Sequence, residues 1–165
     1  MTTTTKKHYP KLSNVLLLLL FSVFILANIF TDTTLERVSF HARGVKEFHL
    51  LTDSPLVLPR VVSNNGNGYN PSTGSFVAPL NGTYCFLAST ETYGANHHAA
   101  MFLMVDDVPM DYVYTYHDTH FQAGSVQAVV QLHVGQRVWL KCSAESYFYD
   151  TPTAFSGFLI HADLP

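Results

Sequence analysis

No segment after Asp32 repeats apolar residues at the i, i+3, i+4 spacing of an amphipathic helix over enough residues to form one. Three catalytic signatures are also missing: the GxSxG nucleophile elbow, the phosphate-binding P-loop and the HExxH zinc helix. Nine Lys and Arg stand against twelve Asp and Glu, with no basic block after the first dozen residues. These absences argue against a helical domain, against enzymes of those three classes and against a nucleic-acid-binding protein.

Charge is scarce as well, since 13% of the 165 residues are charged whereas 47% are hydrophobic. A chain of this length has room for a single core, and this composition is rich enough to fill it. The two cysteines, Cys85 and Cys142, would meet oxidising conditions if the domain is exported. Alternation along their segments turns Cys85 away from an aromatic face and Cys142 inward, so we expect two semi-buried thiols rather than a disulfide.

The longest hydrophobic run is Val15–Phe30, sixteen residues that follow three lysines. Leaving such a run in water would be very unfavourable, so we expect the secretory machinery to read it. Two alternatives stay open: a signal peptide cleaved after Ala27, or an uncleaved anchor of a type II membrane protein with its C-terminal domain outside the cell. Membrane association is expected only in the second case. The expected organisation is a signal peptide or anchor in 1–31, a short linker in 32–37 and a globular domain in 38–165.

Short alternating segments fill the rest of the chain. Residues 70–74 form a turn by their chemistry, because Pro71 fixes φ and Gly74 accepts a left-handed conformation. After the next turn, Gly82 begins a segment whose even-numbered residues are apolar and largely aromatic, with the period of a strand. In the strand that Gly124 starts, even-numbered residues from Val126 to Val134 share one apolar face. Further strands are predicted at Ala99–Val105, Asp111–Tyr116, Arg137–Ser143 and Ala154–Ala162. This spacing is typical of an all-β sandwich or jelly roll.

Four motifs occur in order along this region. They are VSFHAR (Val38–Arg43), a central aromatic pattern, GQRVWL (Gly135–Leu140) and FSGFLI (Phe155–Ile160). The central pattern comprises Leu58, Asn64, Tyr69, Phe76, Gly82, Tyr84, Phe86 and Ala88. From about Val38 to Pro165 the sequence resembles the globular head domain of the complement C1q family, whose closing signature corresponds here to Phe155, Gly157 and Phe158. Leu58 and Ala88 replace aromatic residues of the family pattern, which alters packing without adding polarity.

The resemblance implies an all-β, C1q/TNF-like jelly roll of about ten antiparallel strands that acts as a non-catalytic extracellular module. It also implies a homotrimer whose copies meet at the sheet of the first, last and Tyr84 strands, with Cys85, Ser156 or Phe158 at or near the boundary. Such a trimer would bind microbial surface carbohydrates or extracellular protein ligands in innate immunity. A TNF-like or cerebellin-like signalling ligand at the cell surface is the alternative. The collagen-like stalk of many relatives is missing from Asp32–Arg37, which contains no glycine.

Two loops, Glu91–His98 and His117–Gln122, are the expected ligand contacts. Their candidate residues are Glu91, Tyr93, His97, His98, His117, Asp118 and His120. The histidines could in principle ligate zinc or copper in a metal-dependent jelly-roll enzyme, but no Cys or Glu lies at ligand spacing near them. Calcium is poorly supported, because the second loop offers one carboxylate. We therefore expect no metal and no cofactor.

Two further features complete the sequence-based expectations. Tyr112, Tyr114 and Tyr116 alternate along one strand and suit either a ligand-contacting stripe or a half-buried edge of the core or of a subunit interface. Asn81-Gly82-Thr83 is an N-glycosylation sequon on a turn. We expect a glycan on Asn81 when the chain passes through a eukaryotic secretory pathway.

Overall fold

The computed structural model describes Phe21 and residues 37–92, 94–118 and 120–163. Apart from Phe21, the expected signal segment 1–31, with its cleavage site after Ala27, lies outside the described residues, as does Tyr93. None of the helical structure in the described residues is long and apolar enough to cross a membrane. The part of the chain from Arg37 onward forms one compact unit.

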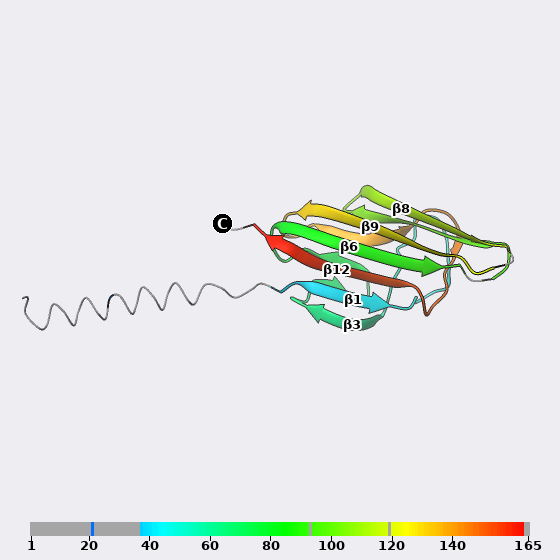
Figure 1. Ribbon diagram of the computed structural model, residues 1–165, viewed down its shortest axis with the longest axis horizontal. Helices are drawn as coiled ribbons and strands as arrows, with labels where there is room; N and C mark the ends of the chain where they lie inside the picture. Colours follow the sequence, from blue (N-terminus) through cyan, green and yellow to red (C-terminus); the bar gives the residue numbers. More distant parts are fainter. Residues whose placement is uncertain (1–20, 22–36, 93, 119, 164–165) are drawn as a thin grey trace, which may run out of the picture. The chain divides into compact units, whose positions relative to one another are not determined.

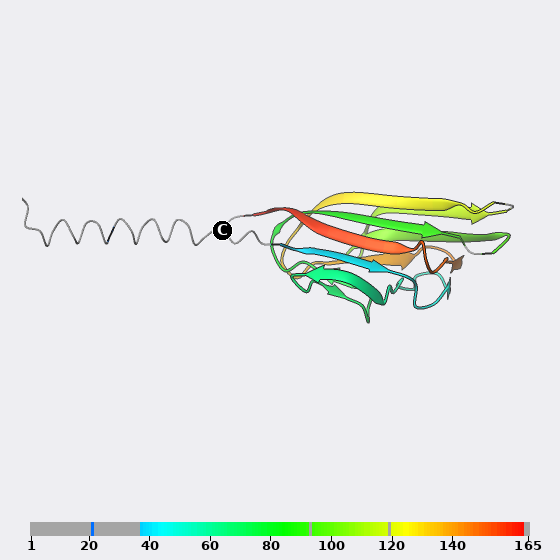
Figure 2. The ribbon, with the colours of Figure 1, turned by 60° about the horizontal axis from the view of Figure 1, so that its bottom comes forward.

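This unit is a sandwich of two antiparallel sheets, each with five strands within the described residues (Figures 1 and 2). The first, here called the β12 sheet, has the order β3 (Arg60–Asn65), β1 (Ser39–Arg43), β12 (Ala154–Ala162), β6 (Gly82–Glu91), β9 (Ala123–Leu132). The second, the β7 sheet, has the order β4 (Tyr69–Asn70), β5 (Ser75–Val77), β10 (Arg137–Cys142), β7 (His97–Val105), β8 (Val108–His117). A short ribbon pairs β2 (His49–Leu50) with β11 (Ser146–Tyr147). The all-β jelly-roll prediction is confirmed.

Aromatic rings dominate the core between the sheets. Phe40 stacks on Tyr69 with ring centroids 4.7 Å apart, and Phe155 meets Phe40 edge-on at 4.9 Å. Pairs of this kind add about 0.5–1.5 kcal/mol beyond the burial of their surface. Four signature side chains are fully or almost fully buried around them: Phe76, Tyr84, Phe86 and the smaller Leu58. The family pattern therefore describes the packing centre of the domain.

One polar member of the pattern, Asn64, holds the start of the β7 sheet in place. Its Nδ2 donates to the Tyr69 carbonyl at 2.8 Å, and its Oδ1 accepts the Tyr69 N–H at 3.1 Å. The Tyr69 hydroxyl in turn donates to the Leu58 carbonyl at 3.0 Å. A short aliphatic side chain at position 64 would leave the Tyr69 backbone groups without these partners. The position therefore needs a side chain that can both donate and accept a hydrogen bond, as the Asn64 amide does.

Strand β12 has the bounds expected from the sequence, and its two faces differ in role. Phe155 and Gly157 point into the core, whereas Ser156 and Phe158 lie on the face turned away from it. Cys85 is opposite Phe158 in the register and lies outside the hydrophobic core cluster, whereas Cys142 belongs to that cluster. Both thiols are free, as expected, and both are more deeply buried than the semi-buried state expected from the sequence.

The prediction that Val134 continues the apolar face of β9 is wrong. Strand β9 ends at Leu132, and Val134 lies in the following turn with 61% of its surface exposed. Gly135 has a φ of 89°, and the Gln136 side chain accepts the His133 N–H at 2.9 Å, so the chain reverses before Val134 can pair. Alternation in sequence ran past the end of the strand because the turn contains an apolar residue.

A buried phenol makes the domain sensitive to alkali. Burial raises the pKa of Tyr69 from 10.0 to about 12. Between these two pKa values the folded state keeps the phenol proton that the unfolded chain releases. The contribution of Tyr69 to the free energy of unfolding is therefore fully present below pH 10 and is lost as the pH rises toward 12. We expect a loss of up to about 3 kcal/mol of unfolding free energy from this group. Urea titrations at several pH values from 9 to 12 would measure it, and Tyr69→Phe should lack this part of the loss. An equally steep loss in Tyr69→Phe would assign the effect to other groups.

Candidate functional site

The two predicted ligand loops lie at the same end of the sandwich, here called the distal end. Strand β6 ends at Glu91 and β7 begins at His97, while β8 ends at His117 and β9 begins at Ala123. The start of β1 and the end of β12 lie at the opposite end of the sandwich (Figure 1). Antiparallel pairing of β6 with β9 and of β7 with β8 thus places loops distant in sequence together.

The structure separates the candidate residues of these loops into different environments. Glu91 is half-buried, and its carbonyl accepts the Tyr149 N–H at 2.8 Å. His97 stacks on Tyr147 with centroids 3.8 Å apart, whereas His98 stacks on Tyr114 at 5.5 Å. The two adjacent histidines therefore contact different rings. Asp118 and His120 are exposed, the side chain of His117 lies outside the described residues, and so does Tyr93.

A stack of three rings at the distal end was not foreseen from the sequence. The Tyr147 ring lies between the rings of His49 and His97, with centroid distances of 4.4 and 3.8 Å and interplanar angles below 10°. Nε2 of His49 lies 2.8 Å from a carboxylate oxygen of Glu145. The three rings come from β2, β11 and β7, so the stack ties the short ribbon to the β7 sheet. Within the described residues, no three His, Cys, Asp or Glu side chains gather closely enough to hold a metal ion.

The outer surface of the β7 sheet carries alternating rings and cations. Tyr112 packs against Phe102 with centroids 4.9 Å apart, and the Lys141 ammonium lies 5.7 Å from the Phe102 ring. The Arg137 guanidinium lies 4.1 Å from the Trp139 ring. Tyr112, Tyr114 and Tyr116 are exposed while Val113 and Thr115 between them are buried, so the interpretation of the tyrosines as an edge of the core is wrong. The two remaining interpretations of these tyrosines are a ligand contact and a subunit interface.

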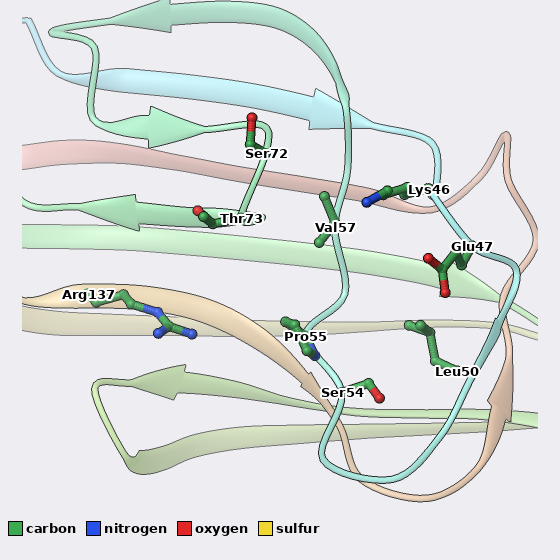
Figure 3. Close-up of a pocket in the computed structure, with 9 residues that line it drawn as sticks. All are labelled: Lys46, Glu47, Leu50, Ser54, Pro55, Val57, Ser72, Thr73 and Arg137. Atoms are coloured by element: carbon green, nitrogen blue, oxygen red, sulfur yellow. The ribbon is translucent and has the colours of Figure 1, made fainter.

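A cleft of about 500 Å³ opens beside this surface, between the loop that follows β1 and the turn that joins β4 to β5 (Figure 3). Lys46 and Arg137 point into it from opposite sides. Its lining residues are Lys46, Glu47, Leu50, Ser54, Pro55, Val57, Ser72, Thr73 and Arg137. No pattern in the sequence predicts this cleft, because its walls come from three separate segments of the chain.

The face of the β12 sheet turned away from the core is uncovered in the single chain and carries an apolar strip among polar side chains, in which Phe158, Cys85 and Val129 are neighbours in the register. Its exposed side chains include Leu87, Val129, Phe158 and Ile160. A hollow of about 260 Å³ on this face includes His41 and Ser156, whose Nδ1 and Oγ atoms are 2.7 Å apart. This outward face of the β12 sheet is called the open face below. An exposed apolar strip with a polar rim is typical of a surface that contacts another protein chain.

The sequon asparagine lies at the end opposite the distal loops. Asn81 is exposed in the turn before β6, and its carbonyl accepts the Asp163 N–H at 3.0 Å. We expect a glycan there when the chain passes through a eukaryotic secretory pathway, because it would project from a turn without covering the distal loops. Treatment with an endoglycosidase should increase gel mobility, and Asn81→Gln should migrate like the treated chain. Unchanged mobility after treatment would show that the sequon is not used.

Comparisons with known proteins agree with this architecture. Residues 39–160 match the C1q domain family. Complement C1q tumor necrosis factor-related protein 2 of Mus musculus is 30% identical over 115 residues, which cover 66% of this chain and 38% of that protein. The globular domain of zebrafish complement 1qA has a TM-score of 0.65 and 19% identity, covering 76% of this chain and 99% of that one. Eiger TNF from S. frugiperda has a TM-score of 0.63 and 10% identity, covering 79% and 96%.

Proposed function

The chain belongs to the C1q domain family, and on that premise we propose that it is a non-catalytic extracellular recognition module that acts as a homotrimer. The open face of the β12 sheet is the observation that carries the proposal. Leu87, Val129 and Phe158 lie exposed on it, and burial against two further copies would remove their apolar surface from water. The start of β1 and the end of β12 lie away from the distal loops, so a trimer would present three sets of those loops at one end.

Trimerisation would convert weak contacts into strong binding. Exposed residues such as Asp118 and His120 offer polar contacts, and the stacked rings of His49, Tyr147 and His97 provide a fixed base near them. Three copies engaging a repetitive microbial surface gain roughly a hundredfold or more in avidity when the geometry permits. Surface carbohydrates of microbes are the proposed ligand class, with a role in innate immunity.

A signalling ligand of the TNF type is the second candidate, because the fold similarity to Eiger TNF is nearly as high as that to the zebrafish C1q domain. The sequence similarity favours a recognition module of the C1q type, since the mouse relative described above is a C1q tumor necrosis factor-related protein. N-terminal sequencing of the mature protein separates the two. A mature chain that begins near Asn28 supports a secreted recognition module, whereas retention of Met1 on cells supports an anchored ligand.

The test of the main proposal combines mass and binding. The chain secreted from eukaryotic cells should have the mass of three copies by light scattering and should bind immobilised bacteria or glycans. The double variant Asp118→Ala with His120→Ala should keep the trimeric mass and bind at least several-fold more weakly. A stable monomer that binds at full strength would contradict the proposal.

A further inference from the structure

We propose that the cleft between Lys46 and Arg137 binds a saccharide unit that carries an anionic group, on the side of the domain and apart from the distal loops. This inference rests on the proposed function of glycan recognition. It adds a second contact and names the chemical class of the ligand.

The charges of the cleft favour an anion. Figure 3 shows the Lys46 ammonium and the Arg137 guanidinium directed into the cleft from opposite sides, with Glu47 as the one carboxylate among its lining residues. Ion pairs in the described part of the chain join His49 to Glu145, Arg60 to Asp150 and Lys141 to Asp53. Neither Lys46 nor Arg137 is in this set. The whole chain has a formal charge of −3, so this cleft differs in sign from the average surface.

Arg137 is held ready for a ligand. Its guanidinium lies 4.1 Å from the Trp139 ring, and the Trp139 Nε1–H donates to the Asp106 carbonyl at 2.8 Å. The nearby Asp106 carboxylate accepts the backbone N–H of Arg137 and the Nε2–H of Gln136, both at 2.9 Å. A guanidinium placed on an aromatic face keeps its in-plane N–H groups for a carboxylate, sulfate or phosphate and loses little entropy on binding.

The rest of the lining suits a sugar. Ser54, Ser72 and Thr73 contribute hydroxyl groups, while Leu50, Pro55 and Val57 contribute apolar surface. A saccharide presents both hydroxyl groups and apolar C–H faces, whereas a bare inorganic anion would need no apolar contact. The volume of about 500 Å³ lies within the roughly 300–1,000 Å³ of small-molecule sites.

The cleft is poorly suited to an extended peptide. Peptides commonly add a strand to a sheet edge whose backbone groups are unpaired. Here the edge of β10 is already used, because the Leu56 N–H donates to the Leu140 carbonyl and the Cys142 N–H donates to the Ser54 carbonyl, both at 2.9 Å. The backbone of the cleft wall is therefore occupied, and recognition falls to side chains.

The walls are fixed before any ligand arrives. The Lys46 N–H donates to the Val57 carbonyl at 2.9 Å, which closes the loop on itself. Gly74, with a φ of 69°, packs so tightly on this loop that an added Cβ would lie 2.5 Å from the Leu56 carbonyl oxygen. Binding of a ligand would therefore lose little conformational entropy from the backbone of these segments.

The test uses the full chain produced in a eukaryotic secretory host and purified in mild detergent. Calorimetry would compare sialyllactose with lactose, glucuronate with glucose, and glucose 6-sulfate and glucose 6-phosphate with glucose. We expect at least one acidic sugar to bind about tenfold or more tightly than its neutral counterpart. Arg137→Gln and Lys46→Gln should each remove most of that preference, in line with the strength of hydrogen bonds to charged groups. Arg43→Gln, which removes one exposed positive charge outside the cleft, should change affinity less than twofold.

The outcomes separate this inference from the proposed function. If acidic sugars bind but Arg137→Gln and Lys46→Gln leave the affinity unchanged, or if Arg43→Gln weakens it equally, the cleft is not the site and glycan recognition stands. If no acidic sugar is preferred while the chain still binds bacteria through its distal loops, the inference also fails alone. A charge-specific loss in both cleft variants, with unchanged thermal unfolding and unchanged trimeric mass, supports it.

Discussion

Gly157→Val is expected to prevent folding or to lower the free energy of unfolding by about 3 kcal/mol or more, at the upper end of the cost of overpacking. Gly157 faces the core from the middle of β12, opposite Phe86 in the register. A Cβ at this position would lie 2.5 Å from Cδ1 of Phe86 and 2.6 Å from Cε1 of Phe40. Both rings are buried and enclosed by Phe76 and Phe155, so neither can move aside without disturbing the others.

The effect comes from space and not from backbone conformation, because Gly157 is not among the glycines with positive φ. Ser156→Val is the matched control, since it adds a branched side chain one residue earlier on the face turned away from the core. We expect it to lower the free energy of unfolding by about 0.5–1.5 kcal/mol, because it removes the hydrogen bond between Ser156 and His41 without entering the core. Urea unfolding followed by circular dichroism measures both variants. A Gly157→Val protein as stable as the parent would mean that the rings of Phe40 and Phe86 do not pack over Gly157 as closely as described.

The long strands could be predicted from the sequence because their periodicity is local. In β6, Tyr84 and Phe86 alternate with residues of the other face, and a period of two over ten residues admits one interpretation. Strand β12 has the predicted bounds for the same reason. The ribbon of β2 and β11 was missed, because strands of two residues have no periodicity and exist only where a distant partner such as Tyr147 supports them.

The candidate site was predicted in part for a related reason. Loops that join paired strands must lie at the ends of a sandwich, so the common position of Glu91 and His117, from two different loops, at the distal end followed from strand order. The cleft did not follow, because Lys46, Ser72 and Arg137 are far apart in sequence and meet only after the loop after β1 crosses to the edge of β10. The ring stack of His49 and Tyr147 depends on the same crossing.

Phe158→Glu is expected to yield a folded monomer by light scattering and to lower the apparent affinity for a repetitive bacterial surface by roughly a hundredfold or more. Phe158 lies on the open face with 43% of its surface exposed, opposite Cys85 in the register. Its side chain does not contribute to the core, so a charge at this position can be solvated in the single chain. In a trimer the same carboxylate would be buried near its two symmetry copies, where desolvation and mutual repulsion oppose assembly.

Val77→Glu is the matched control for this result. Val77 is also 43% exposed but lies on β5, in the β7 sheet. Both variants add one negative charge to an exposed apolar position, so a general effect of charge on solubility would appear in both. The mass by light scattering is the quantity compared, because Val77 is opposite Arg137 in the register and a charge there could also affect binding in the cleft. Dissociation in Phe158→Glu alone assigns the subunit boundary to the open face of the β12 sheet. Dissociation in Val77→Glu alone would assign it to the β7 sheet, where the exposed row of Tyr112, Tyr114 and Tyr116 would then be the contact. A monomeric Phe158→Glu protein that keeps full affinity would separate binding from assembly and remove avidity from the mechanism.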